Sequence, residues 1–307
     1  MLTQHYWSTA GAIAIASGIL KTAAYDNSRS NNLAVYWGQD SYGAANPSST
    51  AKWQHNLSGY CHDDVINVIP LAFLDVFFSI GGDPEINFAN SFCGSSNVAF
   101  PGTNLANCEF MAADIEACQA RGKIVTISLG GASGAATLSS DSQGRAFART
   151  IWDLFLGGNC VTRPFGRAVL DGYYVTAAPQ CPFPDANLGS VLNAASFDAI
   201  YVQFYDNYCE NSEPSAWNFA TWDNWARTQS LNPNVKIYIG APASPSAANS
   251  GYVDAITLGN LAASARSRYP SFGGIMLWDA SQLYVNDQYH IAVKNAMFTS
   301  PEQVKPE

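Results

Sequence analysis

The chain has 307 residues, of which 48% are hydrophobic and only 13% are charged, and its formal net charge is −9. This length and apolar content allow a single large α/β barrel with an extensive buried core. Phosphate backbones and anionic membranes are negative, as the chain is, so we expect neither nucleic acid nor a membrane as a partner, whereas neutral polymers remain compatible.

The N-terminus carries an apolar run over residues 10–20, followed by Thr22-Ala23-Ala24. The run is too short to span a bilayer, and the small residues after it are typical of a signal peptidase site. A buried or frayed helix is the alternative. We predict that residues 1–24 are a signal peptide, that residues 25–307 form a single domain, and that the protein is secreted.

Strands and helices alternate through the first half of the chain. Apolar runs predict strands at 33–37, 65–73 and 124–129, and helical patterns cover 51–60, 110–121 and 142–156. Residues 79–107 form a long loop rich in Gly, Asn and Ser. This order is typical of βα units.

The second half continues in the same way. Residues 168–178 form one uninterrupted run, Ala-Val-Leu-Asp-Gly-Tyr-Tyr-Val-Thr-Ala-Ala, and further strands are predicted at 199–205, 235–239 and 274–278. Helices are predicted at 217–229 and 257–269. Because the strands are almost continuously apolar, we predict a parallel sheet, open or closed, with helices covering it.

Polar and aromatic side chains gather where these strands end, which is where an α/β barrel carries its active site. Tyr201, Gln203 and Tyr205 share one strand face, because side chains alternate along a strand. Buried polar groups need partners. Either a bound ligand or mutual hydrogen bonding could supply those partners, and both alternatives remain open.

Five strand-end motifs, in this order, resemble glycoside hydrolase family 18, and in particular its class III, plant- and fungal-type chitinases. The motifs are Asn32-Leu-Ala-Val-Tyr-Trp-Gly-Gln39, Ser128-Leu-Gly-Gly131, Leu170-Asp-Gly172, Tyr201-Val-Gln-Phe-Tyr205 and Gly274-Ile-Met-Leu-Trp-Asp279. The resemblance extends from about Asn32 to Asn286. It implies a TIM-type (β/α)₈ barrel that hydrolyses the β-1,4 linkages between N-acetylglucosamine units of chitin.

The resemblance also implies a substrate-assisted, retaining mechanism. A Glu that closes the fourth strand, in a DGxDxDxE motif, protonates the leaving oxygen, and the substrate's own N-acetyl oxygen attacks the anomeric carbon. Tyr205 then corresponds to a hydrogen-bond donor to the acetamido oxygen and Gln203 to a contact with the same sugar. Trp278 corresponds to the floor of the pocket and Tyr36 to its lining.

The sequence departs from this pattern after Asp171-Gly172. The next residues, from Tyr173 to Gln180, resemble the fifth strand, so the end of the fourth strand, its loop and its helix are missing, roughly the length of one βα step. Asp171 keeps only a residual motif position. No glutamate ends a predicted strand, and alternation places Asp206 on the face opposite Tyr205. General acid catalysis typically contributes ~10²–10⁴-fold, so we expect little hydrolysis.

Three aspartates stand where the family usually has asparagine and add charge near the predicted cleft, namely Asp40, Asp75 and Asp206.

Seven cysteines are present, an odd number, and neither their spacing nor that of the four histidines is typical of a metal site. We expect no metal and no cofactor. The resemblance implies disulfides between Cys61 and Cys108 and between Cys181 and Cys209, and it leaves Cys93, Cys118 and Cys160 without assigned partners.

Three functional hypotheses follow. The first is a secreted, monomeric chitinase that is impaired by an internal deletion from splicing or from an error in the gene model. The second is a non-catalytic, lectin-like barrel that binds chitin or chito-oligosaccharides. The third is a non-functional product that folds poorly, since the loss of a strand and helix leaves sheet edges and apolar surface exposed.

Overall fold

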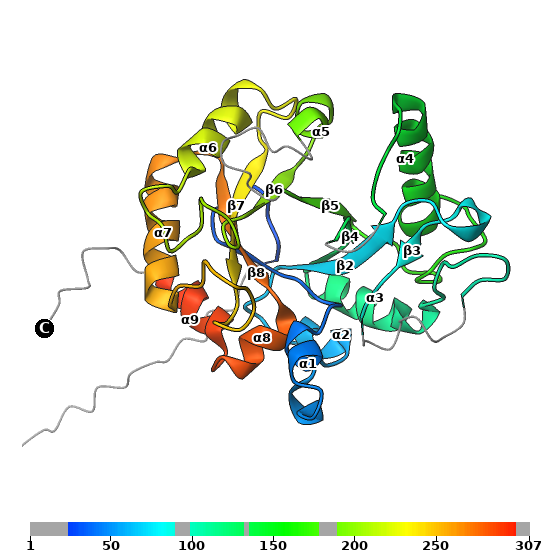
Figure 1. Ribbon diagram of the computed structural model, residues 1–307, viewed down its shortest axis with the longest axis horizontal. Coiled ribbons are helices and arrows are strands. Elements are labelled where there is room, and N and C mark those ends of the chain that lie inside the picture. The colour runs from blue at the N-terminus through cyan, green and yellow to red at the C-terminus, as the bar shows by residue number, and fades with distance from the viewer. Residues whose placement is uncertain (1–23, 90–98, 132–134, 178–188, 299–307) are drawn as a thin grey trace, which may run out of the picture.

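The computed structural model describes residues 24–89, 99–131, 135–177 and 189–298. Its centre is a ring of parallel strands in the order β1-β2-β4-β5-β6-β7-β8, closed by pairing between β8 and β1. Helices lie around the outside of the ring (Figure 1). The predicted TIM-type α/β fold is therefore confirmed, in a partial form that has seven parallel strands in the described ranges.

The strands of the ring are β1 Asn32–Val35, β2 Val68–Val76, β4 Ile124–Leu129, β5 Gly172–Ala177, β6 Ala199–Gln203, β7 Lys236–Pro242 and β8 Phe272–Trp278. A short strand that the sequence did not predict, β3 Glu85–Ile86, pairs antiparallel with the end of β2.

The α-helices are α1 Ser41–Ala45, α2 Leu57–Cys61, α3 Ala112–Ala120, α4 Asp141–Phe155, α5 Gly189–Ala194, α6 Phe219–Thr228, α7 Ala255–Arg268, α8 Ala280–Val285 and α9 Tyr289–Ala296. Three 3₁₀ turns accompany them, at Thr50–Lys52, Ile80–Gly82 and Glu109–Met111. The predicted helices at 142–156, 217–229 and 257–269 correspond to α4, α6 and α7. Helices α1, α5, α8 and α9 are too short to give a clear periodic pattern.

The prediction of one helix over residues 51–60 was wrong, because long-range hydrogen bonds hold the middle of this segment. Trp53 has an extended backbone. The Gln54 backbone N–H donates to Asp40 Oδ1 over 2.9 Å, and its side-chain oxygen accepts from the Gly38 backbone N–H over 2.8 Å. The chain therefore forms a 3₁₀ turn and the short helix α2 on either side of this anchor.

Closure of the ring between β8 and β1 depends on a close backbone approach. Gly274 has a φ of +150°, and a Cβ atom at this position would lie 1.9 Å from the Asn32 carbonyl oxygen. A side chain cannot be accommodated there. The two strands consequently pair from Asn32↔Gly274 to Val35↔Leu277 without interruption.

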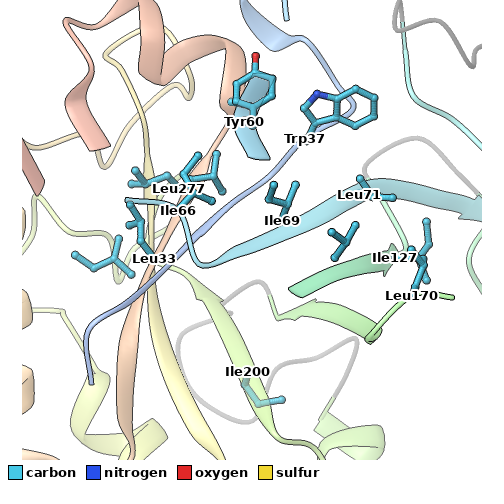
Figure 2. Packing of buried hydrophobic residues seen from close by; sticks show 14 of the residues in the cluster. Leu33, Trp37, Tyr60, Ile66, Ile69, Leu71, Ile127, Leu170, Ile200 and Leu277 are labelled. Atoms are coloured by element: carbon cyan, nitrogen blue, oxygen red, sulfur yellow. The ribbon is translucent and has the colours of Figure 1, made fainter. Parts of the chain in front are cut away.

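The core has two layers, which follow from the alternation of side chains along each strand. The outer layer lies between the strands and the helices, and Figure 2 shows part of it, including Leu33 of β1, Ile69 of β2 and Leu277 of β8. The inner layer fills the barrel with small and aromatic residues, namely Ala34, Tyr36, Val68, Ala72, Tyr174, Ala199, Tyr201, Tyr205, Tyr238 and Met276.

The predicted pairing of Cys61 with Cys108 was wrong. Cys61, at the end of α2, is bonded to Cys118 of α3, with their Cα atoms 4.6 Å apart. The two helices pack against each other, which brings these positions together. Cys108 and Cys209 each form a disulfide as well, and Cys160 is a free thiol. Cys93 and Cys181 lie outside the described residues.

Within the described ranges, every helix is too short or too polar to cross a lipid bilayer.

Candidate functional site

Aromatic side chains meet at the carboxyl ends of β1, β2 and β8, which we call the barrel mouth. The rings of Tyr36 and Trp278 have centroids 5.4 Å apart, and Phe73 stacks on Trp278 at 5.6 Å with an interplanar angle of 20°. The hydroxyl oxygens of Tyr36 and Ser128 lie 3.3 Å apart. The mouth is therefore a packed aromatic surface with hydroxyl groups beside it.

Tyr205 and Gln203 reach the same end of the barrel from β6. Tyr205 belongs to the inner core layer with Tyr36 and Trp278. Burial raises the pKa of the Tyr205 hydroxyl well above its usual value, so this group is a donor at neutral pH. Gln203 is half-buried, and its side-chain nitrogen lies 3.4 Å from the Tyr205 carbonyl oxygen. The structure thus brings together the four residues that the sequence assigned to substrate binding, Tyr36, Gln203, Tyr205 and Trp278.

Asp279, directly after Trp278, fixes the loops around this end. Its carboxylate accepts hydrogen bonds from the Ser41 and Gln282 backbone N–H groups, over 2.9 and 3.2 Å, and from the Ser281 hydroxyl over 2.6 Å. Burial raises the pKa of this fully enclosed carboxyl group. Asp279 therefore ties the start of α1 to the start of α8 and holds the chain on which Trp278 is placed.

Two of the three aspartates that depart from the family pattern accept hydrogen bonds from backbone N–H groups. Asp40 caps α1 by accepting from the Gly43 backbone N–H over 3.1 Å. Asp206 accepts from the backbone N–H groups of Asn249 and Ser250, over 2.8 and 3.0 Å. Asp206 is thus directed at the loop after β7.

The third, Asp75, lies in β2 as the second residue after Phe73. Its side chain is largely buried, and one oxygen accepts from the Asn87 amide over 3.2 Å, while the other has no partner among the described residues. Burial raises the pKa of this carboxyl group, and the nearby Glu85 carboxylate adds to the shift. Asp75 is therefore the carboxyl group near the mouth that has unused hydrogen-bonding capacity.

Asp171 lies at the opposite end of the barrel, just before β5. Its carboxylate accepts from the Val125 backbone N–H over 2.7 Å and from the Gln119 amide over 3.0 Å. Val125 is near the beginning of β4, so Asp171 connects the starts of two neighbouring strands. This position is structural and is remote from the aromatic mouth.

None of the glutamates in the described ranges ends a strand of the ring. Glu85 is in β3, where it accepts from the Ser79 hydroxyl and the Asn104 amide. Glu116 pairs with Arg167 over 2.7 Å on the surface. Glu210 accepts from Ser212 and Ser250. The mouth that the structure describes thus has aromatic, hydroxyl and amide groups and lacks a strand-end glutamate.

The sequence did not identify Phe73 and Ser128 as parts of this surface. Both occur near predicted strand ends, and Ser128 belongs to one of the five strand-end motifs. Their alignment with Tyr36 depends on the register between β1, β2 and β4, which no local pattern specifies.

No family model matches the chain. Individual proteins do match. The chain is 44% identical to Chitinase 2 of Rhizopus oligosporus over 317 aligned positions, which cover 94% of this chain and 56% of the relative. It is 35% identical to the Class III chitinase of Arthroderma benhamiae over 336 positions, covering 95% of this chain and 93% of the relative. The chain spans between half and three fifths of the length of several curated relatives, and nearly all of others.

Solved structures also resemble this chain in fold. The chitinase ICChI from Ipomoea carnea superimposes with a TM-score of 0.69 at 27% identity, covering 86% of this chain and 99% of that one. The xylanase and alpha-amylase inhibitor protein XAIP-II from Scadoxus multiflorus superimposes with a TM-score of 0.68 at 28% identity, covering 87% and 99%.

Proposed function

Because this chain belongs to the class III chitinases of glycoside hydrolase family 18, we propose that its barrel mouth binds chitin chains and that this form of the protein hydrolyses them poorly. The observation that carries the proposal is the separation of two features. The aromatic mouth is assembled, whereas Asp171, the remnant of the acid motif, lies at the other end of the barrel.

Binding by the mouth rests on the arrangement of four side chains. Trp278, stacked on Phe73, presents a ring face to a pyranose, and Tyr36 lines the same surface. Tyr205 remains protonated at neutral pH, because burial raises its pKa, so its hydroxyl can donate to an acetamido oxygen. Gln203 lies beside it and supplies an amide for the same sugar.

Weak hydrolysis follows from the lack of a strand-end glutamate in the described ranges. In the substrate-assisted reaction, the sugar supplies the nucleophile and the protein must supply the proton for the leaving oxygen. Asp279 has both carboxylate oxygens occupied, and Asp206 is bonded to a loop, so neither replaces a strand-end glutamate. Loss of general acid catalysis alone costs ~10²–10⁴-fold in rate.

An internal deletion accounts for this loss. β5 begins at Gly172, so it holds the segment that resembles the fifth strand, and residues 168–171, which resemble the start of the fourth, lie directly before it outside any strand. The match to Chitinase 2 runs over 317 positions, more than the 307 residues of this chain, although it covers only 94% of the chain. The relative therefore contains residues that this chain lacks, which supports an internal deletion, and the family pattern is our reason for placing it between Gly172 and Tyr173.

The decisive experiment restores the missing element. A strand ending in Asp-x-Glu and its helix, about thirty residues taken from a relative, are inserted between Gly172 and Tyr173. We expect hydrolysis of chito-oligosaccharides to rise at least ~10²-fold, and an insert with Gln in place of the final Glu to remain inactive. Turnover by the unaltered chain that equals the restored protein would contradict the proposal. Sequencing the transcript across this junction separates a true deletion from an error in the gene model.

A lectin-like role is the second candidate, favoured by the assembled mouth and by the likeness to XAIP-II, a protein named as an inhibitor. Saturable binding of chitin fragments without turnover, by the folded chain, supports this role. We further propose that residues 1–24 are removed on secretion and that residues 25–307 act as one monomeric domain. N-terminal sequencing and light scattering of the secreted protein test both statements.

A further inference from the structure

The ring of strands has a weak junction between β5 and β6, which we call the seam. In the part of the chain that the structure describes, these strands pair only at Thr176↔Tyr201 and Ala177↔Val202. By contrast, β6 and β7 pair at five positions, from Ala199↔Lys236 to Gln203↔Gly240. The lower part of β5, from Gly172, is therefore not hydrogen-bonded to β6.

A cavity of about 490 Å³ lies at the unpaired part of the seam. Its lining includes Tyr173 and Phe197, on the outside of the barrel, and Tyr174 and Thr126, which belong to the inside. Tyr25 and Asn27, from the segment before β1, complete the lining at the bottom. The cavity thus connects the surface to the interior of the barrel, far from the aromatic mouth, and its size suits a small ligand.

The chemistry of the lining selects one class of ligand. Four aromatic rings and two carboxylates, Asp171 and Asp198, line the cavity, and the lining contains no Lys, Arg or His. One oxygen of Asp171 is held by Val125 and Gln119, which fixes the carboxylate and leaves the other oxygen available. Ring faces and carboxylates both attract organic cations, whereas an anion would be repelled.

Thr126 points to a hydroxylated ligand. Its side chain is 2% exposed and faces the cavity, and its hydroxyl has no hydrogen-bond partner among the described residues. Buried hydroxyls in proteins are nearly always paired, and the lack of a partner among the residues that the structure describes leaves this one available to a bound molecule. An apolar ligand would leave both Thr126 and the carboxylates unpaired.

We propose that the seam cavity binds a hydroxylated organic ammonium ion about as large as a monosaccharide. The ammonium group lies against the carboxylates of Asp171 and Asp198 and the ring of Tyr173 or Tyr174, and a hydroxyl group bonds Thr126. This site is separate from the mouth and does not depend on the function proposed above.

The test uses D-glucosamine as the probe, measured by isothermal titration calorimetry with the full chain. We expect saturable binding, and at least about fivefold weaker binding of glucose, which matches glucosamine in shape but lacks the charge, and of N-acetylglucosamine, in which an added acetyl group removes the charge. Asp171→Asn and Asp198→Asn should each weaken glucosamine about fivefold, and Thr126→Val should weaken it by a smaller factor. Asp141→Asn is the charge-matched control. This exposed carboxylate lies at the start of α4, away from the cavity, so its replacement should have no effect.

Two results would overturn the proposal. One is equal affinity for glucosamine and glucose, or no saturable binding of either. The other is loss of glucosamine binding in Trp278→Ala with retention in both aspartate variants, which would place the sugar at the mouth. Since Asp171 also connects β4 and β5, each variant is first compared with the unaltered chain by near-UV circular dichroism, and Asp198→Asn decides the outcome if Asp171→Asn unfolds.

Discussion

The two sides of the barrel differ in how completely they are built. On one side, β6, β7, β8 and β1 pair over four to six positions at each junction and carry Tyr205, Trp278 and Tyr36. On the other side, β5 joins β6 through only two pairs, and in Figure 1 the helices that flank β5, α4 and α5, stand apart. The complete side holds the groups to which we assign sugar binding, and the incomplete side holds the segment that, by the family pattern, should carry the acid. A barrel that lost a βα unit there would keep the proposed binding surface.

Ring closure bears on whether a chain with such a deletion can fold. Every strand of the ring has two neighbours, because β5 pairs with β4 on one side and with the upper part of β6 on the other. The sheet edges that a deletion was expected to expose are absent from the described strands, and the junctions with the fewest pairs are that of β1 with β2, at Ala34↔Val68, and the seam. The hypothesis of a poorly folding product rested on exposed sheet edges and on exposed apolar surface. It therefore loses the first of these two physical grounds.

The largest effect on stability is expected at the disulfide that links α2 to α3. Cys61→Ser combined with Cys118→Ser removes a disulfide that closes a loop with a sequence separation of 57 residues. The chain-entropy model gives a loss of about 4 kcal/mol in the free energy of unfolding. Urea denaturation measures this loss, and Cys160→Ser, at a free thiol, is the control that should leave the midpoint unchanged.

A pair of core substitutions compares the two sides directly. Ile239 of β7 is completely buried, so Ile239→Ala should cost about 3 kcal/mol from lost burial and the cavity created. Tyr173 of β5 borders the seam and is 44% exposed, so Tyr173→Ala should cost less than about 1 kcal/mol. Urea midpoints of the two variants provide the measurement. Similar losses would show that the seam is as well packed as the rest of the ring.

Sugar binding at the complete side should depend on Trp278. Trp278→Ala removes the ring that stacks on Phe73, and we expect the Kd for chitotriose to rise about tenfold. Tryptophan fluorescence or calorimetry measures the change. Trp152→Ala, at an exposed position on α4, is the matched control and should bind as the unaltered chain does.

The smallest expected effect concerns pH and Asp75. Burial raises the pKa of this carboxyl group, so the folded protein holds its proton to a higher pH than the unfolded chain does. Stability should therefore fall as the pH rises from about 4 through the raised pKa, by less than about 1 kcal/mol. Asp75→Asn should remove this decline, measured as the thermal midpoint between pH 3 and pH 8, whereas Asp64→Asn, at an exposed site, should retain it.

Much of the fold and of the mouth could be predicted from the sequence. The uninterrupted apolar strands, the long helices near α4, α6 and α7, and the convergence of Tyr36, Gln203, Tyr205 and Trp278 follow from periodicity and from the rule that strand ends share one edge. The partner of Cys61 could not be predicted, because it depends on how α2 packs on α3. The division of the predicted helix at 51–60 likewise depends on distant contacts through Gln54.

The sequence by itself determined the strand type and the order of the βα units, because these features are read from neighbouring residues. Only the tertiary structure decided how the chain closes, namely through the tight approach of Gly274 to Asn32 and through the half-paired seam at β5. Closure is a property of all the strands together, since each strand of the ring pairs with two neighbours. The position of Asp171 follows from this pairing: the residue lies directly before β5, which pairs with β4, and there it accepts from the Val125 backbone N–H at the end opposite the mouth.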